Sequence, residues 1–136
     1  MHLNAYLNFN GDCEAAFKFY EKCLGGKIVV MQRHGDSPMA DHVPAGWRDR
    51  IMHARLDIGN AVLMGADAPP ESYQRPQGLY VSVGFAKAED VDRVFAALSD
   101  KGTVQMPAQK TFWSERFGMF VDRFGIPWMV NCDPTL

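Results

Sequence analysis

The sequence has no cluster of lysine and arginine, no long apolar run and no Cys-x-x-Cys pair. Its 14 basic and 16 acidic residues give a formal net charge of −2, so it lacks the basic surface that nucleic-acid binding requires. No apolar stretch approaches the roughly 20 residues of a membrane span. The first ten residues also lack the charged start and apolar core of a secretion signal. We therefore expect neither a nucleic-acid nor a membrane partner.

Cysteine is scarce, with only Cys13, Cys23 and Cys132. An odd number of cysteines without a secretion signal predicts reduced thiols and a cytoplasmic location. Core packing is the expected role of all three, because a buried free cysteine behaves as a small hydrophobe. A nucleophilic pair of Cys132 with His53 is the alternative, although nothing in the spacing brings the two together.

The composition is that of an ordinary soluble protein. The chain has 136 residues, of which 47% are hydrophobic and 22% charged, which excludes disordered and fibrous classes. This length is enough for one domain with a core of its own. We predict a single domain over residues 1–136.

Hydrophobic periodicity predicts the same series of elements twice. In the first half, alternating residues predict strands and a 3.6-residue repeat predicts a helix: strands 3–9, 27–34, 51–58 and 61–65, with a helix in 11–26. In the second half the predicted strands are 79–85, 103–109, 113–122 and 127–132, with a helix in 88–102. Residues 35–48 and the proline-rich linker 67–78 read as irregular segments.

This repeated order predicts an α+β fold of two βαβββ modules, 1–66 and 79–136. One helix and four strands cannot cover both faces of a sheet. We therefore expect two curled mixed sheets around a cleft, with the helices outside.

The strand faces opposite the helices supply the candidate ligand-binding residues. In strand 3–9 the apolar side chains alternate with Asn4, Tyr6 and Asn8, which must then face the cleft. The same alternation assigns the following residues to ligand binding: Tyr6, Asn8, His53, Arg55, Tyr80, Trp113, Phe117, Met129 and Asn131. A mixed aromatic and polar wall is typical of a small-molecule pocket. The alternative for any one of them is a solvated strand face.

Three stretches resemble the PhnB-like family of the vicinal oxygen chelate superfamily: "YLNFNGDCEAAFKFYEKCLGG", "IMHARLDIGNAVLMGAD" and "FWSERFGMFVDRFGIPWMVN". That superfamily includes glyoxalase I, fosfomycin-resistance proteins, extradiol dioxygenases and bleomycin-binding proteins. The resemblance spans nearly the whole chain. It implies paired βαβββ modules, usually assembled as a homodimer.

The resemblance also implies where a metal ligand would stand. Metal-dependent relatives carry His or Gln on the first strand of a module, His on the first strand of the second, and Glu on the last strand. Here the first two places fall around 4–6 and 80–82 without His or Gln, and the third is Met129. A thioether is a poor ligand for hard divalent ions. We therefore predict no metal ligands and no cofactor. A divalent metal held by His53, Asp57, Asp67 and His34 is the less favoured alternative.

Two functions follow as hypotheses. The first is a metal-independent small-molecule-binding protein of the bleomycin-resistance type. The second is a lyase or isomerase acting on a small oxygenated or phosphonate-like metabolite, with His53 and Glu115 as candidate catalytic residues. An ion pair of Glu115 with Arg116 or Arg123 is the alternative to its catalytic role. Although PhnB-like proteins are sometimes labelled demethylubiquinone methyltransferases, the sequence has no glycine-rich strand-to-helix turn for that cofactor.

Overall fold

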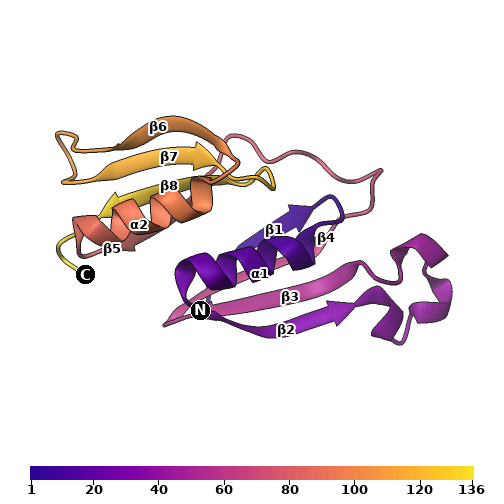
Figure 1. Ribbon diagram of the computed structural model, residues 1–136. Coiled ribbons are helices and arrows are strands. Elements are labelled where there is room, and N and C mark those ends of the chain that lie inside the picture. Colours follow the sequence, from indigo (N-terminus) through magenta and orange to yellow (C-terminus); the bar gives the residue numbers. More distant parts are fainter. The chain divides into compact units, whose positions relative to one another are not determined.

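The computed structural model describes residues 1–136, and its elements follow the predicted βαβββ order twice (Figure 1). The first series is β1 (Ala5–Phe9), α1 (Cys13–Leu24), β2 (Lys27–Arg33), β3 (Ile51–Ile58) and β4 (Ala61–Asp67). The second is β5 (Val81–Phe85), α2 (Ala88–Ser99), β6 (Thr103–Gln109), β7 (Phe117–Val121) and β8 (Pro127–Cys132).

The chain divides into two compact units, Met1–Gln74 and Arg75–Leu136, and the division falls inside the predicted linker. Each unit contains a four-stranded mixed sheet, ordered β1-β4-β3-β2 in the first and β5-β8-β7-β6 in the second. In each sheet the first strand runs parallel to the last, and the other neighbouring strands are antiparallel. The α+β fold and the repeat are therefore confirmed at the level of topology.

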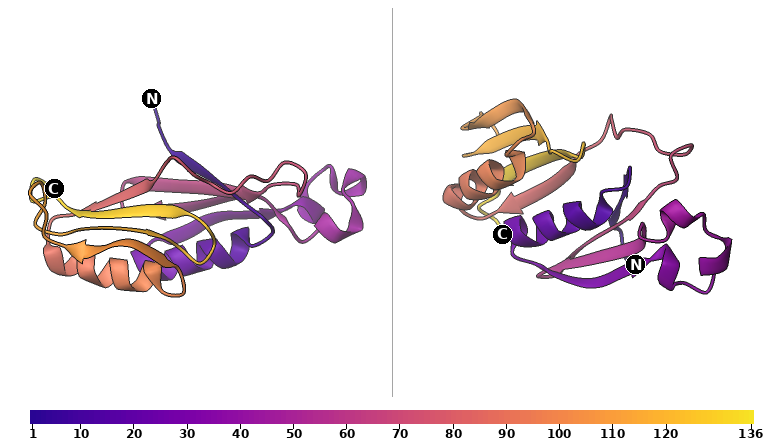
Figure 2. Two further views of the ribbon diagram at one scale, coloured as in Figure 1. Left: turned by 90° about the horizontal axis from the view of Figure 1, so that it is seen from above. Right: turned by 45° about the vertical axis from the view of Figure 1, so that its right-hand side comes forward.

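Each helix lies against one face of its own sheet and leaves the other face uncovered by any element of that unit (Figure 2). α1 buries Cys13, Ala16, Phe17, Tyr20 and Cys23. The helical repeat in the sequence predicted a face that included Phe19 and Leu24, which are only half-buried. It missed Cys13 and Phe17, which are buried. Gly25 ends α1 in the left-handed conformation, with φ of 74°, as its position predicted.

The second unit repeats this packing. α2 buries Val91, Val94 and Leu98, as its 3.6-residue pattern predicted. Phe95 adds an edge-to-face contact with Phe120 of β7 at 5.1 Å between ring centroids. Gly118 is required beneath that contact, because a Cβ there would lie 2.5 Å from the Phe95 ring.

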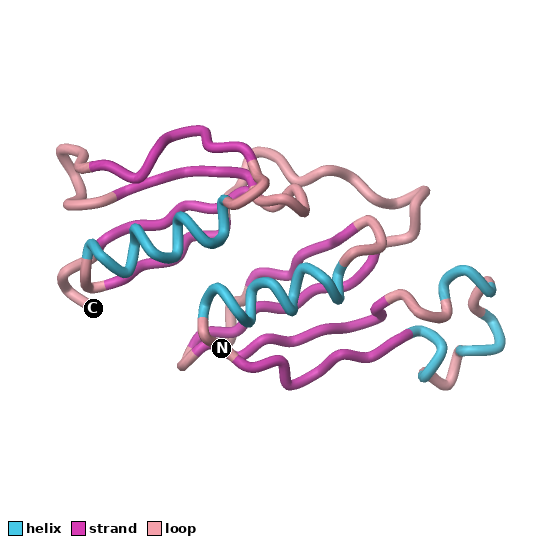
Figure 3. The backbone as a smooth tube through the Cα atoms, in the orientation of Figure 1, coloured by secondary structure: helices cyan, strands magenta, loops and turns pink.

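Two segments differ from the predictions. β7 begins at Phe117, so the strand predicted from residue 113 is four residues too long, and residues 110–116 form a loop. Phe112, predicted to pack in the core, is 96% exposed on that loop. The β2–β3 connection is not simply irregular, because it contains three short helical turns: His34–Asp36, Ala40–His42 and Ala45–Trp47 (Figure 3). No helix in either unit has the length and apolar character needed to cross a membrane.

Candidate functional site

In the first unit, the sheet face turned away from α1 carries Tyr6, Asn8, His53 and Arg55. Leu7 and Phe9 of β1 are buried under α1, which leaves Tyr6 and Asn8 on the opposite side. In β3, Ala54 and Leu56 are buried in the same way, so His53 and Arg55 also lie on the uncovered face. The predicted division of these two strands into faces therefore matches the structure.

Tyr6 and His53 form the closest polar contact on this face. The Tyr6 hydroxyl lies 3.0 Å from His53 Nδ1, and the two rings stack at 5.7 Å between centroids. Burial, with a smaller contribution from Cys13, raises the pKa of Tyr6, so the phenol remains protonated near neutral pH. The hydroxyl can then donate to Nδ1, which places the proton of a neutral imidazole on Nε2.

Arg55, expected to present a positive charge, is already paired. Its Nε lies 2.7 Å from Asp57 Oδ1 on the same strand, and both side chains are partly exposed. The ion pair offsets much of the positive charge that the sequence predicted for an anionic ligand. Met64 of β4 stands between Tyr6 and Arg55 in the sheet register, at the centre of the uncovered face.

In the second unit, the uncovered face is largely a row of methionines. Register places Ser82 of β5 beside Met129 of β8, Met129 beside Met119 of β7, and Met119 beside Met106 of β6. All three methionines are half-buried. Methionine side chains are flexible and polarizable, so such a row adapts to ligands of different shape. Sequence reasoning named Met129 but missed Met119 and Met106, because a row across strands depends on register.

An aromatic pair lies beside this row, two residues further along the strands. Phe117 is the register partner of Asn131, and the Trp113 ring packs edge-to-face on Phe117 at 5.4 Å between centroids. Trp113 remains 54% exposed. The side-chain oxygen of Asn131 is buried and accepts no hydrogen bond. Three of the predicted ligand-binding residues therefore lie together here.

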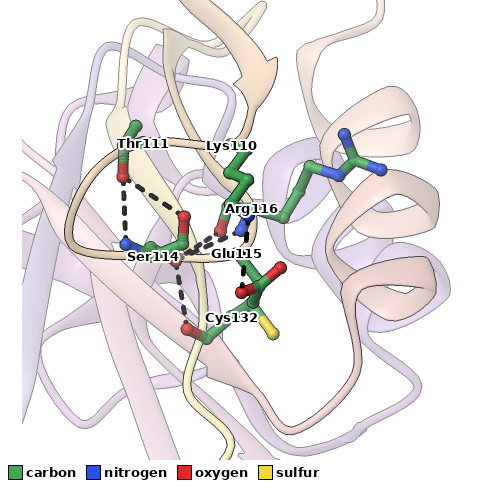
Figure 4. Close-up of polar contacts among 6 residues, drawn as sticks. All are labelled: Lys110, Thr111, Ser114, Glu115, Arg116 and Cys132. Atoms are coloured by element: carbon green, nitrogen blue, oxygen red, sulfur yellow. Dashed lines mark hydrogen bonds and ion pairs between the residues drawn. The ribbon is translucent and has the colours of Figure 1, made fainter.

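Ser114 fixes the loop that carries Trp113 (Figure 4). Its hydroxyl oxygen lies 2.9 Å from the carbonyl oxygen of Arg116 and 3.1 Å from that of Cys132. On the other side of the loop, the Thr111 hydroxyl accepts from the backbone N–H of Ser114. These bonds replace strand pairing in residues 111–116, which explains why the alternation of Trp113, Glu115 and Phe117 is not a strand.

Glu115 does not have the surroundings predicted for a catalytic acid. Its side chain is 63% exposed, and its carboxylate lies 4.0 Å from Lys110 Nζ. Neither alternative partner is correct, because Arg116 pairs with Asp92 and Arg123 pairs with Asp100. Glu115 and Trp113 line a pocket of about 270 Å³ together with Lys110, Thr111, Phe112, Ser114, Cys132 and Pro134.

Tyr80 lies apart from the aromatic pair. It precedes Val81, whose register partner is Trp128, whereas Phe117 pairs with Asn131. The offset of about four residues corresponds to roughly 13 Å along the strands. The Tyr80 hydroxyl donates instead to Gln105 Oε1 at 3.0 Å. Tyr80 and the aromatic pair therefore lie on opposite sides of the methionine row.

The residues present do not fit a metal ion. The three places where metal-dependent relatives carry ligands hold Tyr6, Tyr80 with Ser82, and Met129. The alternative set is divided, because His53 and Asp57 lie on the uncovered face while Asp67 is buried and bonds the N-terminus of α1. No group of three or more His, Cys, Asp or Glu side chains is gathered closely enough to hold a metal.

The first unit also has a pocket that sequence reasoning did not find. Its volume is about 350 Å³, and it is lined by His34, His42, Val43, Pro44, Trp47, Met52, Asp67, Pro69 and Glu71. Most of these residues lie in segments with no hydrophobic periodicity. One feature of the sequence could have indicated the pocket, because the segment between β2 and β3 is longer than the equivalent segment of the second half.

Comparison with known proteins identifies the family. Residues 2–130 match the Glyoxalase/Bleomycin resistance protein/Dioxygenase superfamily. The protein YjdN of Escherichia coli K12 is 32% identical, over 96% of this chain and 95% of its own length. The structure is similar to that of PA1353 from Pseudomonas aeruginosa, with a TM-score of 0.90 and 45% identity over 98% of each chain. It also resembles the PhnB protein from Bacillus cereus, with a TM-score of 0.82 and 23% identity over 98% of this chain and all of that one.

The family match covers nearly the whole chain, and two of these relatives exceed 30% identity over almost their full length. The chain is therefore a PhnB-like member of the Glyoxalase/Bleomycin resistance protein/Dioxygenase superfamily.

Proposed function

We propose that this chain is a metal-independent small-molecule-binding protein that holds a planar, largely apolar ligand on the methionine row of its second unit. The observation that carries the proposal is the row itself, Met106–Met119–Met129, with a half-exposed tryptophan beside it. Members of the superfamily are named for binding or transforming small molecules.

The aromatic pair supplies the stacking surface. Trp113 is costly to leave in water, and Phe117 holds its ring in an edge-to-face contact. The Ser114 hydrogen bonds fix the loop before any ligand arrives, so little conformational entropy is lost on binding. A ligand stacked on Trp113 would lie over Met119 and Met129.

Asn131 determines which polar group the ligand should carry. Its unpartnered oxygen would be satisfied by a ligand N–H or O–H group, and a buried acceptor left unpaired costs about 1–3 kcal/mol. A planar ligand with one donor at its edge is therefore favoured over a purely apolar one. On the first unit's uncovered face, Asn8, His53 and Arg55 remain predicted ligand-binding residues of that unit alone.

The test uses methionine ε-methyl NMR with a library of planar aromatic compounds. Compounds that bind should shift the signals of Met119 and Met129, and Trp113→Ala should weaken their binding about 3–10-fold, the value of one aromatic contact. Tyr73→Ala is the matched control, because Tyr73 lines neither pocket. Binding that leaves both methyl signals and the Trp113→Ala affinity unchanged contradicts the proposed site.

Metal independence is tested in the same titration. Protein stripped with a chelator should keep its affinity, and added Mn²⁺ or Zn²⁺ should not strengthen it. An affinity that appears only with added metal would overturn this part of the proposal. A homodimer and a cytoplasmic location belong to the same proposal, and sedimentation velocity tests the dimer.

A lyase or isomerase is the second candidate, favoured by the Tyr6–His53 pair. The hydrogen bond from the phenol orients the imidazole and leaves Nε2 available for proton transfer. Turnover of α-keto hemithioacetals or of small phosphonates that His53→Ala abolishes and Tyr6→Phe reduces would support it. Turnover indifferent to His53→Ala would exclude this role for the pair.

A further inference from the structure

The second pocket of the first unit is built by a segment that the second unit does not have. Residues 34–50 connect β2 to β3, whereas only residues 110–116 connect the equivalent β6 to β7. The longer segment folds back on itself, with Gly35 N–H bonded to the Arg48 carbonyl at 2.8 Å and His34 N–H to the Arg50 carbonyl at 2.9 Å. Its three helical turns border the 350 Å³ pocket, which is within the size range of small-ligand sites.

This pocket is separate from the uncovered sheet face. Met52 lines it, and its neighbour His53 points to the opposite side of β3. Asp67 also lies on the α1 side of the sheet, where its carboxylate accepts from the backbone N–H of Cys13. A ligand here would therefore not contact the Tyr6–His53 pair.

Asp67 places a buried carboxylate in the pocket wall, and no cationic side chain pairs with it. The residue is 4% exposed, and its oxygens accept from Cys13 N–H at 3.0 Å and from Ile51 N–H at 2.8 Å. It forms no ion pair. A buried carboxylate without a cationic partner is costly, and two backbone donors leave further lone pairs unused. The N-terminus of α1 already stabilises this carboxylate through the Cys13 N–H, and a bound cation would add a full positive charge beside it.

In the rest of the lining only His34 and His42 can carry a positive charge, and a neutral imidazole does not repel a cation. Glu71 adds a second carboxylate at the exposed side, and no lysine or arginine lines the pocket. Of the neighbouring arginines, Arg50 donates to the Gly11 carbonyl at 2.6 Å and Arg33 pairs with Glu14 at 2.6 Å. The third, Arg48, is exposed and does not line the pocket.

Trp47 provides a surface for the organic part of such a ligand. Its ring lies edge-to-face with His34 at 5.6 Å between centroids, which holds it in place as part of the pocket wall. Tryptophan is the best aromatic partner for an ammonium group, and Met52, Val43 and Pro44 extend the apolar wall.

We propose that this pocket is a second binding site, independent of the proposed function, and that it takes a small organic cation such as a protonated or quaternary amine. The ammonium group lies on the Trp47 ring between Asp67 and Glu71.

The test compares choline with its neutral isostere, 3,3-dimethylbutan-1-ol, on the full chain labelled with 5-fluorotryptophan. Choline should shift the ¹⁹F signal of Trp47 and leave those of Trp113 and Trp128 in place. The isostere should bind at least about fivefold more weakly, because it lacks the cation–π and charge contributions. Equal binding by the two compounds overturns the proposal, as does the lack of any choline-induced Trp47 shift up to tens of millimolar.

Two variants locate the site. Trp47→Leu should abolish choline binding, read from the ε-methyl signal of Met52, and a thermal melt checks that the variant is folded. Glu71→Gln alters an exposed side chain that does not threaten folding, and it should weaken choline severalfold. Glu89→Gln, an exposed glutamate on α2, is the matched control and should have no effect. Choline affinity that Glu71→Gln and Glu89→Gln change equally contradicts the site.

Discussion

Replacing Asp122 should destabilise the chain far more than replacing any exposed carboxylate. Asp122 follows β7, is 4% exposed, and its Oδ1 accepts from the N–H groups of Phe124 at 2.8 Å and Ile126 at 3.0 Å. Its Oδ2 accepts from the Trp128 indole N–H at 2.8 Å. One side chain therefore satisfies three donors of the turn that sets the β7–β8 register.

The magnitude follows from the donors that are left behind. Hydrogen bonds to a charged group contribute about 1.5–3 kcal/mol each, and the Ile126 and Trp128 donors are buried. Phe124 N–H is only partly buried and can bond water, so we expect Asp122→Ala to cost about 3–5 kcal/mol. A domain of this size is stable by about 5–15 kcal/mol, so this is a large fraction of the total.

Urea unfolding followed by far-UV circular dichroism measures the loss as a lower midpoint at an unchanged slope. Asp100→Ala is the matched control, because Asp100 is an exposed acid whose ion pair with Arg123 should contribute less than about 1 kcal/mol.

A double-mutant cycle separates the indole hydrogen bond from the rest. Asp122→Asn keeps the size and shape of the side chain. If its amide oxygen accepts from the two backbone N–H groups, its NH₂ group lies against the indole N–H of Trp128, so two donors face each other. The cost of Asp122→Asn should therefore fall by about 1–2 kcal/mol in a Trp128→Phe background, which has no indole donor. A loss below 1 kcal/mol for Asp122→Ala, or a coupling of zero, would refute the assigned role.

Three further predictions concern the first unit. Hydrogen bonding to Lys18, and then to Arg33, lowers the pKa of Glu14 in the folded protein below its ordinary value of 4.5. The ionised Glu14 therefore contributes its full stabilisation of the fold above pH 4.5, and this contribution is lost as the pH falls through the lowered pKa. Glu14→Gln should cost less than about 1 kcal/mol in urea at neutral pH and progressively less below about pH 4, and a pH-independent cost would contradict this. Burial raises the pKa of the Cys13 thiol, so iodoacetamide should alkylate Cys13 only slowly in native protein at about pH 8. Mass spectrometry measures the alkylation, and rapid modification of Cys13 would contradict the prediction. Gly25→Ala meets no neighbouring atom but must keep a φ of 74°, so it should lower stability by about 1 kcal/mol, and an unchanged urea midpoint would contradict that cost.

Much of the fold was predictable because it depends on local periodicity. The alternation in β3, β6 and β8 matched the strands to the residue, at 51–58, 103–109 and 127–132. The alternation in 113–117 failed because it is mimicked by a loop in which the Ser114 hydroxyl bonds two backbone carbonyls. A buried serine and an exposed one look alike in sequence.

The candidate site was predictable only within each strand. The period of two placed Tyr6 and His53 on one face, because both strands also bury apolar side chains under α1. The same alternation could not predict that Tyr80 lies about 13 Å along the sheet from Phe117, because that separation depends on the register of β5 and β7 with β8. The pocket beside Trp47 could not be predicted for a different reason, because the segment that forms most of it has no hydrophobic periodicity.

Comparing the two sheets position by position separates what specifies the fold from what selects the ligand. Their equivalent first strands place a phenylalanine next to the helix, Phe9 fully buried and Phe85 half-buried, so this helix-facing position keeps the same chemistry. On the uncovered faces only the central methionine is shared, Met64 in one sheet and Met129 in the other. Around Met64 stand a tyrosine and an ion-paired arginine, and around Met129 a serine and further methionines. Because the same backbone supports both faces, folding alone does not fix which side chains they carry, and a ligand bound to only one of them, as proposed, would account for the difference.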